Sequence, residues 1–317
     1  MPLPAPFSQL RLPVIAAPMF IVSNPALVIA QVRAGIVGSF PALNARPASQ
    51  LDEWLHEITE ATVGCAAPFA VNLIVHKTNN RLEEDLAICA KWRVPLVITS
   101  LGAREDVNAA VHDWGGMVLH DVIDDAFARK AIAKGADGLI AVAAGAGGHA
   151  GSQSPFALMQ EIRSWFEGPV ALSGAIANGR SILAAQALGA DFAYIGTPWI
   201  ATPEANAVEG YKQAIVDGHA ADIVNSNLFT GVHGNYLRTS ITAAGMDPDN
   251  LPEGDVSTMN FGSGGTSAAK AWRDIWGSGQ GIGAIEAVEP VAARVERMAA
   301  QYDAAVAELA AKTQRGD

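Results

Sequence analysis

Short apolar runs alternate along the chain with longer stretches in which hydrophobic residues recur every three or four positions. Nearly continuous apolar runs are typical of parallel strands buried on both faces, and the longer period is typical of amphipathic helices. The runs predict eight strands, at residues 14–17, 36–40, 69–75, 96–100, 117–122, 138–144, 170–176 and 192–200. The stretches between them predict helices at residues 25–33, 49–61, 80–91, 104–112, 124–134, 154–166 and 179–188, with a further helix at 204–217.

Eight strand–helix units in a row favour an α/β fold, a closed (β/α)8 TIM barrel. The sequence Gly-Ala-Asp, at residues 135–137 and 189–191, fits this fold because a glycine that caps a helix leads through a short turn into the next strand. A doubly wound open sheet is the alternative. Against it, the Gly-x-Gly-x-x-Gly fingerprint that a dinucleotide fold needs does not follow the first strand.

The alternation stops between residues 219 and 279, where Pro, Gly, Asn and Ser accumulate. A long irregular stretch in a compact domain usually carries function or covers a site. Residues 285–312 then predict a long amphipathic helix. We therefore expect a barrel formed by residues 1–217 and 280–317, with a small insertion or lid domain at 218–279, after the eighth strand.

Composition narrows the class of protein. The formal net charge is −11 and no basic run exceeds two residues, so we expect no nucleic-acid partner. No apolar run reaches the roughly 20 residues that a membrane helix needs, and the N-terminus has no apolar core of a signal peptide. Cys65 and Cys89 fit neither a disulfide framework nor the spacing of metal ligands. We expect a cytoplasmic protein with no metal and no membrane contact.

Two neighbouring strand ends suggest a phosphate site. In TIM barrels such a site commonly follows strands seven and eight, and here these strands lead into Ser173-Gly174-Ala175 and Gly196-Thr197. Backbone N–H groups near glycine, with a helix N-terminus behind them, suit a phosphate dianion. The alternative is that these glycines only make turns. Their position at the two expected strands favours the phosphate site.

Three polar residues at other strand ends are candidates for chemistry. His149 lies in a loop with four nearby glycines, where an imidazole that titrates near neutral pH can serve as general base or hydrogen-bond donor. Asn72 is an unusual amide within an apolar strand, so we expect it to contact a bound ring. His120 ends the fifth strand and either supports the site or is structural. A buried structural role is the alternative for each of the three.

Together these motifs resemble the nitronate monooxygenase family, formerly called 2-nitropropane dioxygenases, which are FMN-dependent TIM barrels. The most specific piece is the loop Gly147-Gly148-His149-Ala150-Gly151. It is supported by Ala17-Pro18-Met19, by Ser-Gly-Ala-Ile-Ala-Asn-Gly at 173–179 and by Tyr-Ile-Gly-Thr at 194–197. Residues 276–281 are similar to the family's Gly-Gln-Gly segment, which returns to the cofactor after the insertion. The resemblance spans nearly the whole chain.

The resemblance implies FMN as cofactor and a set of residues that contact it. These are Ala17, Pro18, Met19, Asn72, Ser100, His120, Ala143, Gly148, Ser173, Gly174, Ala175, Gly196, Thr197 and Gln280. Within this set, Pro18, Met19 and Asn72 are expected at the isoalloxazine ring or ribityl chain, and Gln280 near the cofactor. Gly174, Ala175, Gly196 and Thr197 are expected at the phosphate.

The same resemblance implies an oxidoreductase whose partners are a small-molecule substrate and dioxygen, and it is compatible with a homodimer. His149 matches the family's catalytic histidine. It would remove the α-proton of a neutral nitroalkane, or orient an anionic nitronate. The products would be a carbonyl compound and nitrite.

Two departures and several relatives leave the reaction open. Ala175 stands where the family often has a second glycine, and Pro198-Trp199 stands where many relatives carry a basic residue and Phe, which affects the expected pocket shape. Related flavin barrels with the same loop include NAD(P)H:quinone reductases and enoyl-acyl-carrier-protein reductases. A flavin-binding protein with a sensing or storage role is an alternative of another class. An inosine-monophosphate-dehydrogenase-like enzyme is excluded, because it needs a cysteine after strand six.

Overall fold

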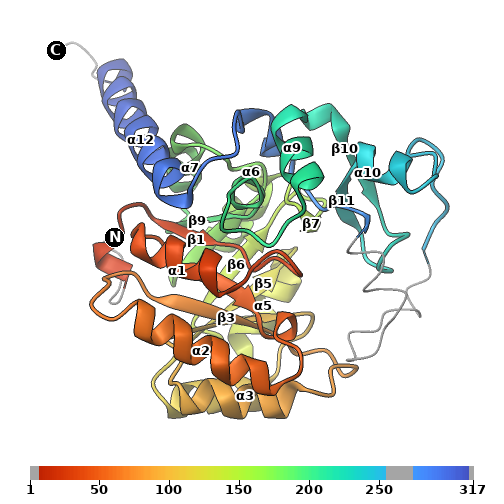
Figure 1. The fold of residues 1–317 in the computed structure, drawn as a ribbon. Helices are drawn as coiled ribbons and strands as arrows, with labels where there is room; N and C mark the ends of the chain where they lie inside the picture. The colour runs from red at the N-terminus through yellow and green to blue at the C-terminus, as the bar shows by residue number, and fades with distance from the viewer. Residues whose placement is uncertain (1–6, 255–273, 314–317) are drawn as a thin grey trace.

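The computed structural model describes residues 7–254 and 274–313, and eight parallel strands form its centre (Figure 1). They are β1 (Val14–Ala16), β2 (Gly38–Pro41), β3 (Phe69–Ile74), β4 (Leu96–Ser100), β5 (Met117–Val122), β6 (Gly138–Val142), β8 (Val170–Ser173) and β9 (Phe192–Ile195). They pair in the order β1-β9-β8-β6-β5-β4-β3-β2. A parallel bridge between Ile15 and Val37 joins the two ends of this order. The sheet is therefore a barrel, which confirms the (β/α)8 prediction over the open sheet.

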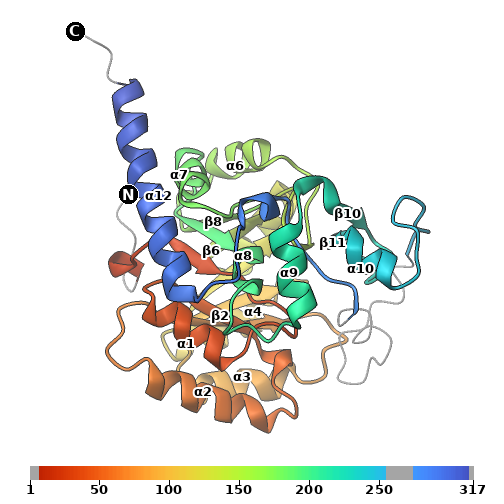
Figure 2. The same ribbon diagram turned by 45° about the horizontal axis from the view of Figure 1, so that its top comes forward.

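Helices cover the outside of the barrel (Figures 1 and 2). They are α1 (Pro25–Arg33), α2 (Ser49–Ala61), α3 (Leu82–Lys91), α4 (Glu105–Asp113), α5 (Asp125–Ala133), α6 (Pro155–Arg163) and α7 (Gly179–Ala187). The side chains of Asn24, Asp124 and Asn178 cap α1, α5 and α7, each accepting a hydrogen bond from a backbone N–H of the first turn. Gly135 and Gly189 follow α5 and α7 with positive φ, as the Gly-Ala-Asp motif predicts.

The C-terminal helix α12 (Val291–Thr313) packs along α7 and α1 on the outside of the barrel. Its buried side chains include Val291, Val295 and Met298, which lie three or four residues apart and so form one apolar stripe. Among the helices that the structure describes, none has the length and apolar composition to cross a bilayer.

The barrel interior is a packed apolar core. Successive residues of a strand point to opposite faces, so each strand sends alternate side chains inward and toward the helices. The inward set consists of Ile15, Val37, Ala70, Leu96, Ile98, Leu119, Ile140, Ala171 and Phe192, together with Phe7. Phe7, in the 3-10 turn η1 (Phe7–Gln9), packs edge-on against Phe192 with ring centroids 5.1 Å apart. The ring of Phe7 therefore fills the amino-terminal end of the barrel.

The last strand is shorter than the sequence predicts. The expected strand at 192–200 ends at Ile195, and residues Thr197–Ile200 form the short helix α8. Pro198 has no N–H for a strand ladder and its fixed φ suits the first turn of a helix, which explains the early end. Trp199 is completely buried, and its indole N–H donates to the Ile195 carbonyl over 2.8 Å. The substitution of Pro198-Trp199 for the family's basic residue and Phe therefore changes the core beside β9.

A second, antiparallel sheet joins the insertion to the barrel. It contains β10 (Ile223–Ser226), β11 (Gly234–Leu237) and β7 (Gly148–His149), in the order β10-β11-β7. The helices α9 (Glu209–Asp217) and α10 (Arg238–Ala243) flank it in the chain. The sequence predicts none of these strands, since each is two to four residues long and has no apolar run of its own. Residues 255–273 of the expected insertion lie outside the described residues.

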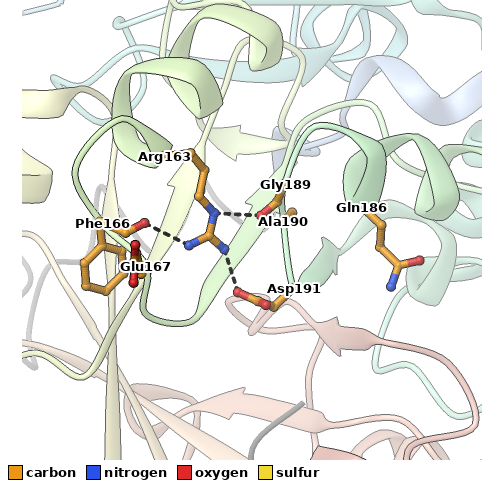
Figure 3. A pocket seen from close by; sticks show the side chains of 7 residues that line it. All are labelled: Arg163, Phe166, Glu167, Gln186, Gly189, Ala190 and Asp191. Carbon is orange, nitrogen blue, oxygen red and sulfur yellow. Dashed lines mark hydrogen bonds and ion pairs between the residues drawn. The ribbon is translucent and has the colours of Figure 1, made fainter. Parts of the chain in front are cut away.

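Arg163, at the end of α6, connects two loops on the face of the barrel opposite to the strand exits (Figure 3). Its guanidinium donates to the carbonyls of Gly189 (2.7 Å), Phe166 (3.1 Å) and Gly168 (2.7 Å) and to the carboxylate of Asp191 (2.6 Å). The same carboxylate oxygen accepts the N–H of Val170, the first residue of β8. Arg163 therefore fixes the start of two neighbouring strands, and a planar, charged fork is needed to reach all four acceptors.

We expect Arg163→Ala to lower the free energy of unfolding by roughly 2–3 kcal/mol, because it leaves Asp191 and three carbonyls without their shared donor. The free energy of unfolding of Arg163→Lys should lie between those of the wild type and Arg163→Ala, because an ammonium group cannot reach all four acceptors. Denaturant unfolding of the three proteins measures the effect. Cofactor content should be unchanged, because the strand exits lie at the other end of the barrel. A loss of less than about 0.5 kcal/mol, the range of ordinary surface changes, would contradict this role.

Candidate functional site

A cavity of about 890 Å³ lies at the carboxyl ends of the strands, enclosed by the strand exits and by residues of the insertion. This volume is near the upper end of the range for small-molecule and cofactor sites, which leaves room for a cofactor and a substrate together. The ring of Phe7 and the apolar core described above fill the opposite end of the barrel. The catalytic face predicted from the sequence therefore coincides with the open end of the barrel.

Most of the residues expected at the site line this one cavity. They are Ala17, Pro18, Met19, Asn72, Ser100, His120, Gly148, His149, Ser173, Gly174, Ala175, Gly196 and Thr197. Ala143 and Gln280 do not line it. Ala143 belongs to the buried layer between strands and helices, and Gln280 has an exposed side chain. Gly279 and Gly281, on either side of Gln280, do line the cavity.

The loops after β8 and β9 form a cradle of backbone groups. Gly174 has a φ of +139°, and a Cβ there would lie 2.8 Å from the Ala144 carbonyl oxygen, so only glycine fits. Among the described residues, the amide N–H groups of Gly174, Gly196 and Thr197 have no hydrogen-bond acceptor. Unpaired N–H groups on two adjacent loops are the groups that bind a phosphate dianion. The first turn of α7 is different, because Asn178 already caps it.

Ala175 occupies a backbone conformation that favours glycine. Its φ is +54°, which for a residue with a Cβ costs about 1 kcal/mol. The family's glycine at this position therefore has a physical explanation. Its amide donates to the Gly145 carbonyl over 3.2 Å, so the strained residue still connects the two loops.

The segment after the insertion returns to these loops, as the resemblance implies. The amide of Gly279 donates to the Thr197 hydroxyl over 2.9 Å, and the amide of Gln280 donates to the Gly145 carbonyl over 2.9 Å. A Cβ at Gly279 would lie 2.7 Å from that same Gly145 oxygen. Three chain segments that are far apart in sequence are thus packed backbone to backbone beside the cradle.

His149 lies on a strand and is supported by the insertion. In β7, Gly148 pairs with Asn235 and His149 pairs with Gly234 of β11. The side-chain amide of Asn235 also donates to the Ala146 carbonyl over 2.6 Å. The sequence suggests an isolated glycine-rich loop for His149. Its backbone is instead held by hydrogen bonds to a strand more than 80 residues away.

The side chain of Thr230 contacts the imidazole of His149. The Thr230 hydroxyl donates to the Val232 carbonyl over 3.0 Å, and its oxygen lies 3.2 Å from His149 Nε2. With the hydroxyl proton directed to Val232, the imidazole donates Nε2–H to Thr230 and Nδ1 carries the lone pair.

Burial lowers the pKa of His149 to about 4, because the apolar surroundings disfavour the imidazolium. The sequence alone suggests a value near that of free imidazole, about 6.5. The ring is therefore neutral throughout the physiological range. A neutral imidazole is the form that acts as a base.

Asn72 has a defined orientation at the floor of the cavity. Its side-chain nitrogen donates to the Ile98 carbonyl over 3.0 Å and to the Ser100 hydroxyl oxygen over 2.8 Å. Both amide protons are thus used within the barrel. Its Oδ1 oxygen is the atom that can accept a hydrogen bond from a ligand.

Asp121, which the sequence did not single out, lines the cavity together with His120. Val118 and Val122 pack toward the helices and Leu119 packs inside, so alternation sends His120 outward and Asp121 inward. His120 Nδ1 lies 2.6 Å from the Thr99 hydroxyl, and burial lowers its pKa to about 4. A structural role for His120 thus explains its contacts. The alternation of inward and outward residues along β5 is the feature of the sequence that could have identified Asp121 as a residue facing the cavity.

The mouth of the cavity also contains side chains that the sequence did not identify. Tyr211 stacks on Trp276 with ring centroids 5.0 Å apart, and its hydroxyl donates to the Gly277 carbonyl. Ile123, Phe127 and Val208 line the cavity and are 45%, 51% and 64% exposed. Exposed apolar side chains around a pocket are typical of a binding surface for an apolar group. They lie at the start of α5 and just before α5 and α9, where a single hydrophobic residue gives no periodic signal.

Known proteins resemble this chain in sequence and fold. The family described as nitronate monooxygenase matches residues 5–298. A nitronate monooxygenase of Paraburkholderia phytofirmans is 28% identical, over 74% of this chain and 76% of the relative. A second relative, from Mycobacterium tuberculosis, is 26% identical over 72% of this chain and 64% of its own length. It is a (3aS,4S,5R,7aS)-5-hydroxy-7a-methyl-1-oxo-octahydro-1H-indene-4-carboxyl-CoA dehydrogenase.

Two solved structures share the fold over almost their whole length. Nitroalkane oxidase from Streptomyces ansochromogenes superposes with a TM-score of 0.80 at 23% identity, covering 95% of this chain and 98% of that one. FabK from Thermotoga maritima superposes with a TM-score of 0.78 at 24% identity, covering 96% of each chain. At this identity the structures establish the fold, and the family match over residues 5–298 carries the assignment. The chain belongs to the nitronate monooxygenase family and is an FMN-dependent oxidoreductase.

Proposed function

We propose that this enzyme oxidises nitroalkanes and their nitronates with dioxygen, giving a carbonyl compound and nitrite, and that His149 is its general base. The observation that carries the proposal is the position of His149: a neutral imidazole that lines the cavity, with Nε2 3.2 Å from the Thr230 hydroxyl oxygen. A base must be neutral and must present a lone pair to the acidic C–H of the substrate. Nδ1 meets both requirements.

The cavity has a suitable group for each part of FMN. The unpaired amides of Gly174, Gly196 and Thr197 would hold the phosphate. Asn72 Oδ1, at the opposite side of the barrel mouth, would accept a hydrogen bond from the ring system. When bound, FMN supplies the electron acceptor that couples substrate oxidation to dioxygen. The chain's own residues bind the substrate, orient its α-carbon and remove the proton.

A second candidate is reduction of an acyl or quinone substrate with NAD(P)H. It is favoured by the exposed apolar side chains of Ile123, Phe127 and Val208, which exceed what a small nitroalkane needs. The relatives include a CoA-ester dehydrogenase and FabK, whose chains match at 26% and 24% identity. The two candidates differ in which compound delivers electrons to the flavin.

Anaerobic mixing separates these candidates. Purified protein is mixed with propyl-2-nitronate and, separately, with NADH, while the flavin absorbance near about 450 nm is followed, because that band reports the oxidation state of the cofactor. Bleaching by the nitronate and not by NADH is the result expected. Bleaching by NADH alone would replace the proposed function by the second candidate.

We expect His149→Ala to reduce turnover of neutral nitroalkanes by roughly 10²–10⁴-fold, the usual contribution of a positioned base. Turnover of a preformed nitronate should fall much less, because that substrate has already lost its proton. FMN content serves as the control and should stay constant, since the phosphate contacts come from β8 and β9. Equal losses with both substrates would mean that His149 orients the substrate and is not the base.

The pH profile of the wild type follows from the lowered pKa of His149. The imidazole accepts a proton only when neutral, so the rate with a neutral nitroalkane should increase as pH rises through about 4. The increase should be complete by about pH 6, two units above that pKa. Steady-state kcat/KM between pH 4 and 8 measures it. A single rise centred near pH 6.5 that disappears in His149→Ala would instead indicate an imidazole of ordinary pKa.

Thr230→Val should lower turnover of neutral nitroalkanes by roughly three- to tenfold, because the Nε2–H tautomer is then sampled and no longer imposed. Thr230→Ser keeps the hydroxyl and should stay close to the wild type. Turnover of preformed nitronate provides the internal comparison, since it needs no base. If valine and serine behave alike, the hydroxyl does not set the tautomer of His149.

A further inference from the structure

Two exposed apolar side chains follow β5 at the wall of the cavity. Ile123 lies in the turn between β5 and α5, and Phe127 lies in the first turn of α5. They are 45% and 51% exposed, and both line the cavity. Single exposed apolar residues are common on protein surfaces, but two that border a cavity indicate a surface that a ligand covers. The proposed mechanism uses only the reacting end of the substrate and assigns neither side chain a task.

Ile123 packs against the loop that carries His149. Gly151 follows His149 by two residues in this loop. A Cβ at Gly151 would overlap the carbonyl oxygen of Val142 and would lie 3.3 Å from the Cβ of Ile123. Only glycine fits at this position, and the missing side chain lets Ile123 approach the loop closely. Ile123 therefore lies beside the proposed base.

Val232, in the insertion, adds a third apolar side chain next to this loop. The amide of Ala150 donates to the carbonyl of His233 over 3.2 Å, so residues 232 and 233 lie against the loop. The carbonyl of Val232 accepts the hydroxyl proton of Thr230, whose oxygen contacts His149. The side chain of Val232 is half-buried and lines the cavity. Val232 is thus a neighbour of the proposed base as well.

The side chains of Ile123, Phe127 and Val232 form an apolar wall of the cavity, the β5 wall. This wall begins beside His149 and ends at side chains that are about half exposed to water. A substrate whose reacting carbon lies at His149 therefore has an apolar surface beside it for the rest of its chain.

The charges around the β5 wall disfavour an anionic tail. Among the described residues that line the cavity, Arg46 is the one Arg or Lys, and it follows β2, which is separated from β5 by β3 and β4. The start of α5 carries Asp124 and Asp125, of which the first caps the helix and the second pairs with Arg129. A phosphate or carboxylate tail would find no cation on this wall, and burial of an unpaired charge is costly. An uncharged alkyl chain suits the wall.

We propose that the β5 wall is a subsite for the alkyl chain of the substrate, so that this enzyme selects nitroalkanes and nitronates with chains of several carbons over shorter ones. The inference rests on the proposed function for the reacting end of the substrate and adds a site for the other end. Each methylene that lies on an apolar wall leaves water, and full burial of one methylene strengthens binding by about fourfold. A shorter chain leaves Ile123 and Phe127 exposed to water and gains less.

Butanoate, hexanoate and octanoate test this inference without any turnover. Their planar carboxylate matches a nitronate group in shape and charge, and the three ions differ only in chain length. Their dissociation constants are measured on the FMN-loaded enzyme from the change in flavin absorbance. Each added methylene should tighten binding by about two- to fourfold, the range from half to full burial. A wild type whose affinity does not increase with chain length would overturn the subsite.

Three variants locate the alkyl chain. Phe127→Gln should bind octanoate roughly four- to fifteenfold more weakly than the wild type, the loss of contact with about two methylenes, and should change butanoate binding much less. Ile123→Thr keeps the branched shape and should weaken octanoate binding by about two- to fourfold. Phe156→Gln makes the same change as Phe127→Gln at the start of α6, at a side chain that is 62% exposed and does not line the cavity, and should match the wild type at every chain length. FMN content and melting temperature show whether each variant is folded.

Val208→Gln distinguishes the two sides of the cavity mouth. Val208 precedes α9, which follows β9, and β9 is separated from β5 by β8 and β6. Val208→Gln should weaken octanoate binding less than Phe127→Gln does. A larger loss in Val208→Gln, or equal effects of Phe127→Gln and Phe156→Gln, would overturn the assignment of the chain to the β5 wall.

The outcomes separate this inference from the proposed function. The carboxylates have no nitro group, so their binding does not depend on which reaction the enzyme catalyses. A chain-length effect that Phe127→Gln reduces supports the subsite even if nitronates are not turned over, and the proposed function then fails alone. Turnover of nitronates without a chain-length effect in binding is the reverse case, in which the subsite fails and the proposed function stands.

Discussion

Closure of eight parallel strands into a barrel is the constraint on which the rest of the structure depends. Closure gives every strand an inner and an outer face, so alternate residues must fill the core or meet the helices. It also brings all eight strand exits around one cavity. Residues as distant in sequence as Pro18 and Thr197 line the same cavity for this reason.

Elements with a strong local pattern could be predicted from the sequence. The strands Leu96–Ser100 and Met117–Val122 and the helices Pro25–Arg33 and Ser49–Ala61 have the bounds expected from their apolar runs. The two loops where the sequence predicts a phosphate site were likewise visible as a glycine after each of the strands β8 and β9. The antiparallel sheet β10-β11-β7 was not, because hydrogen bonds between short strands far apart in the chain leave no period to detect. The end of β9 was missed because Pro198 acts on one residue only.

The site residues show the same difference: features with a local sequence pattern could be predicted, and contacts between distant segments could not. His149 was recognisable by its glycine-rich surroundings, whereas its contact with the Thr230 hydroxyl, 81 residues later, was not. His120 was recognisable as a histidine at a strand end, and it lines the cavity while its Nδ1 lies 2.6 Å from the Thr99 hydroxyl. Asp121, its neighbour, enters the cavity. Once the register of the barrel is known, the alternation of residues along a strand therefore indicates which side chains face the cavity better than residue type does.

The pairing of β7 with β11 has a consequence for how this fold diversifies. The insertion supplies apolar side chains to the cavity mouth, and it also holds the backbone of the loop that carries His149, the proposed base, through Gly234 and Asn235. Exchange of this segment between homologues would alter ligand shape and acid–base geometry in one event. Recombination at this boundary could therefore change chemistry in a single step, whereas point changes inside the barrel would adjust it gradually.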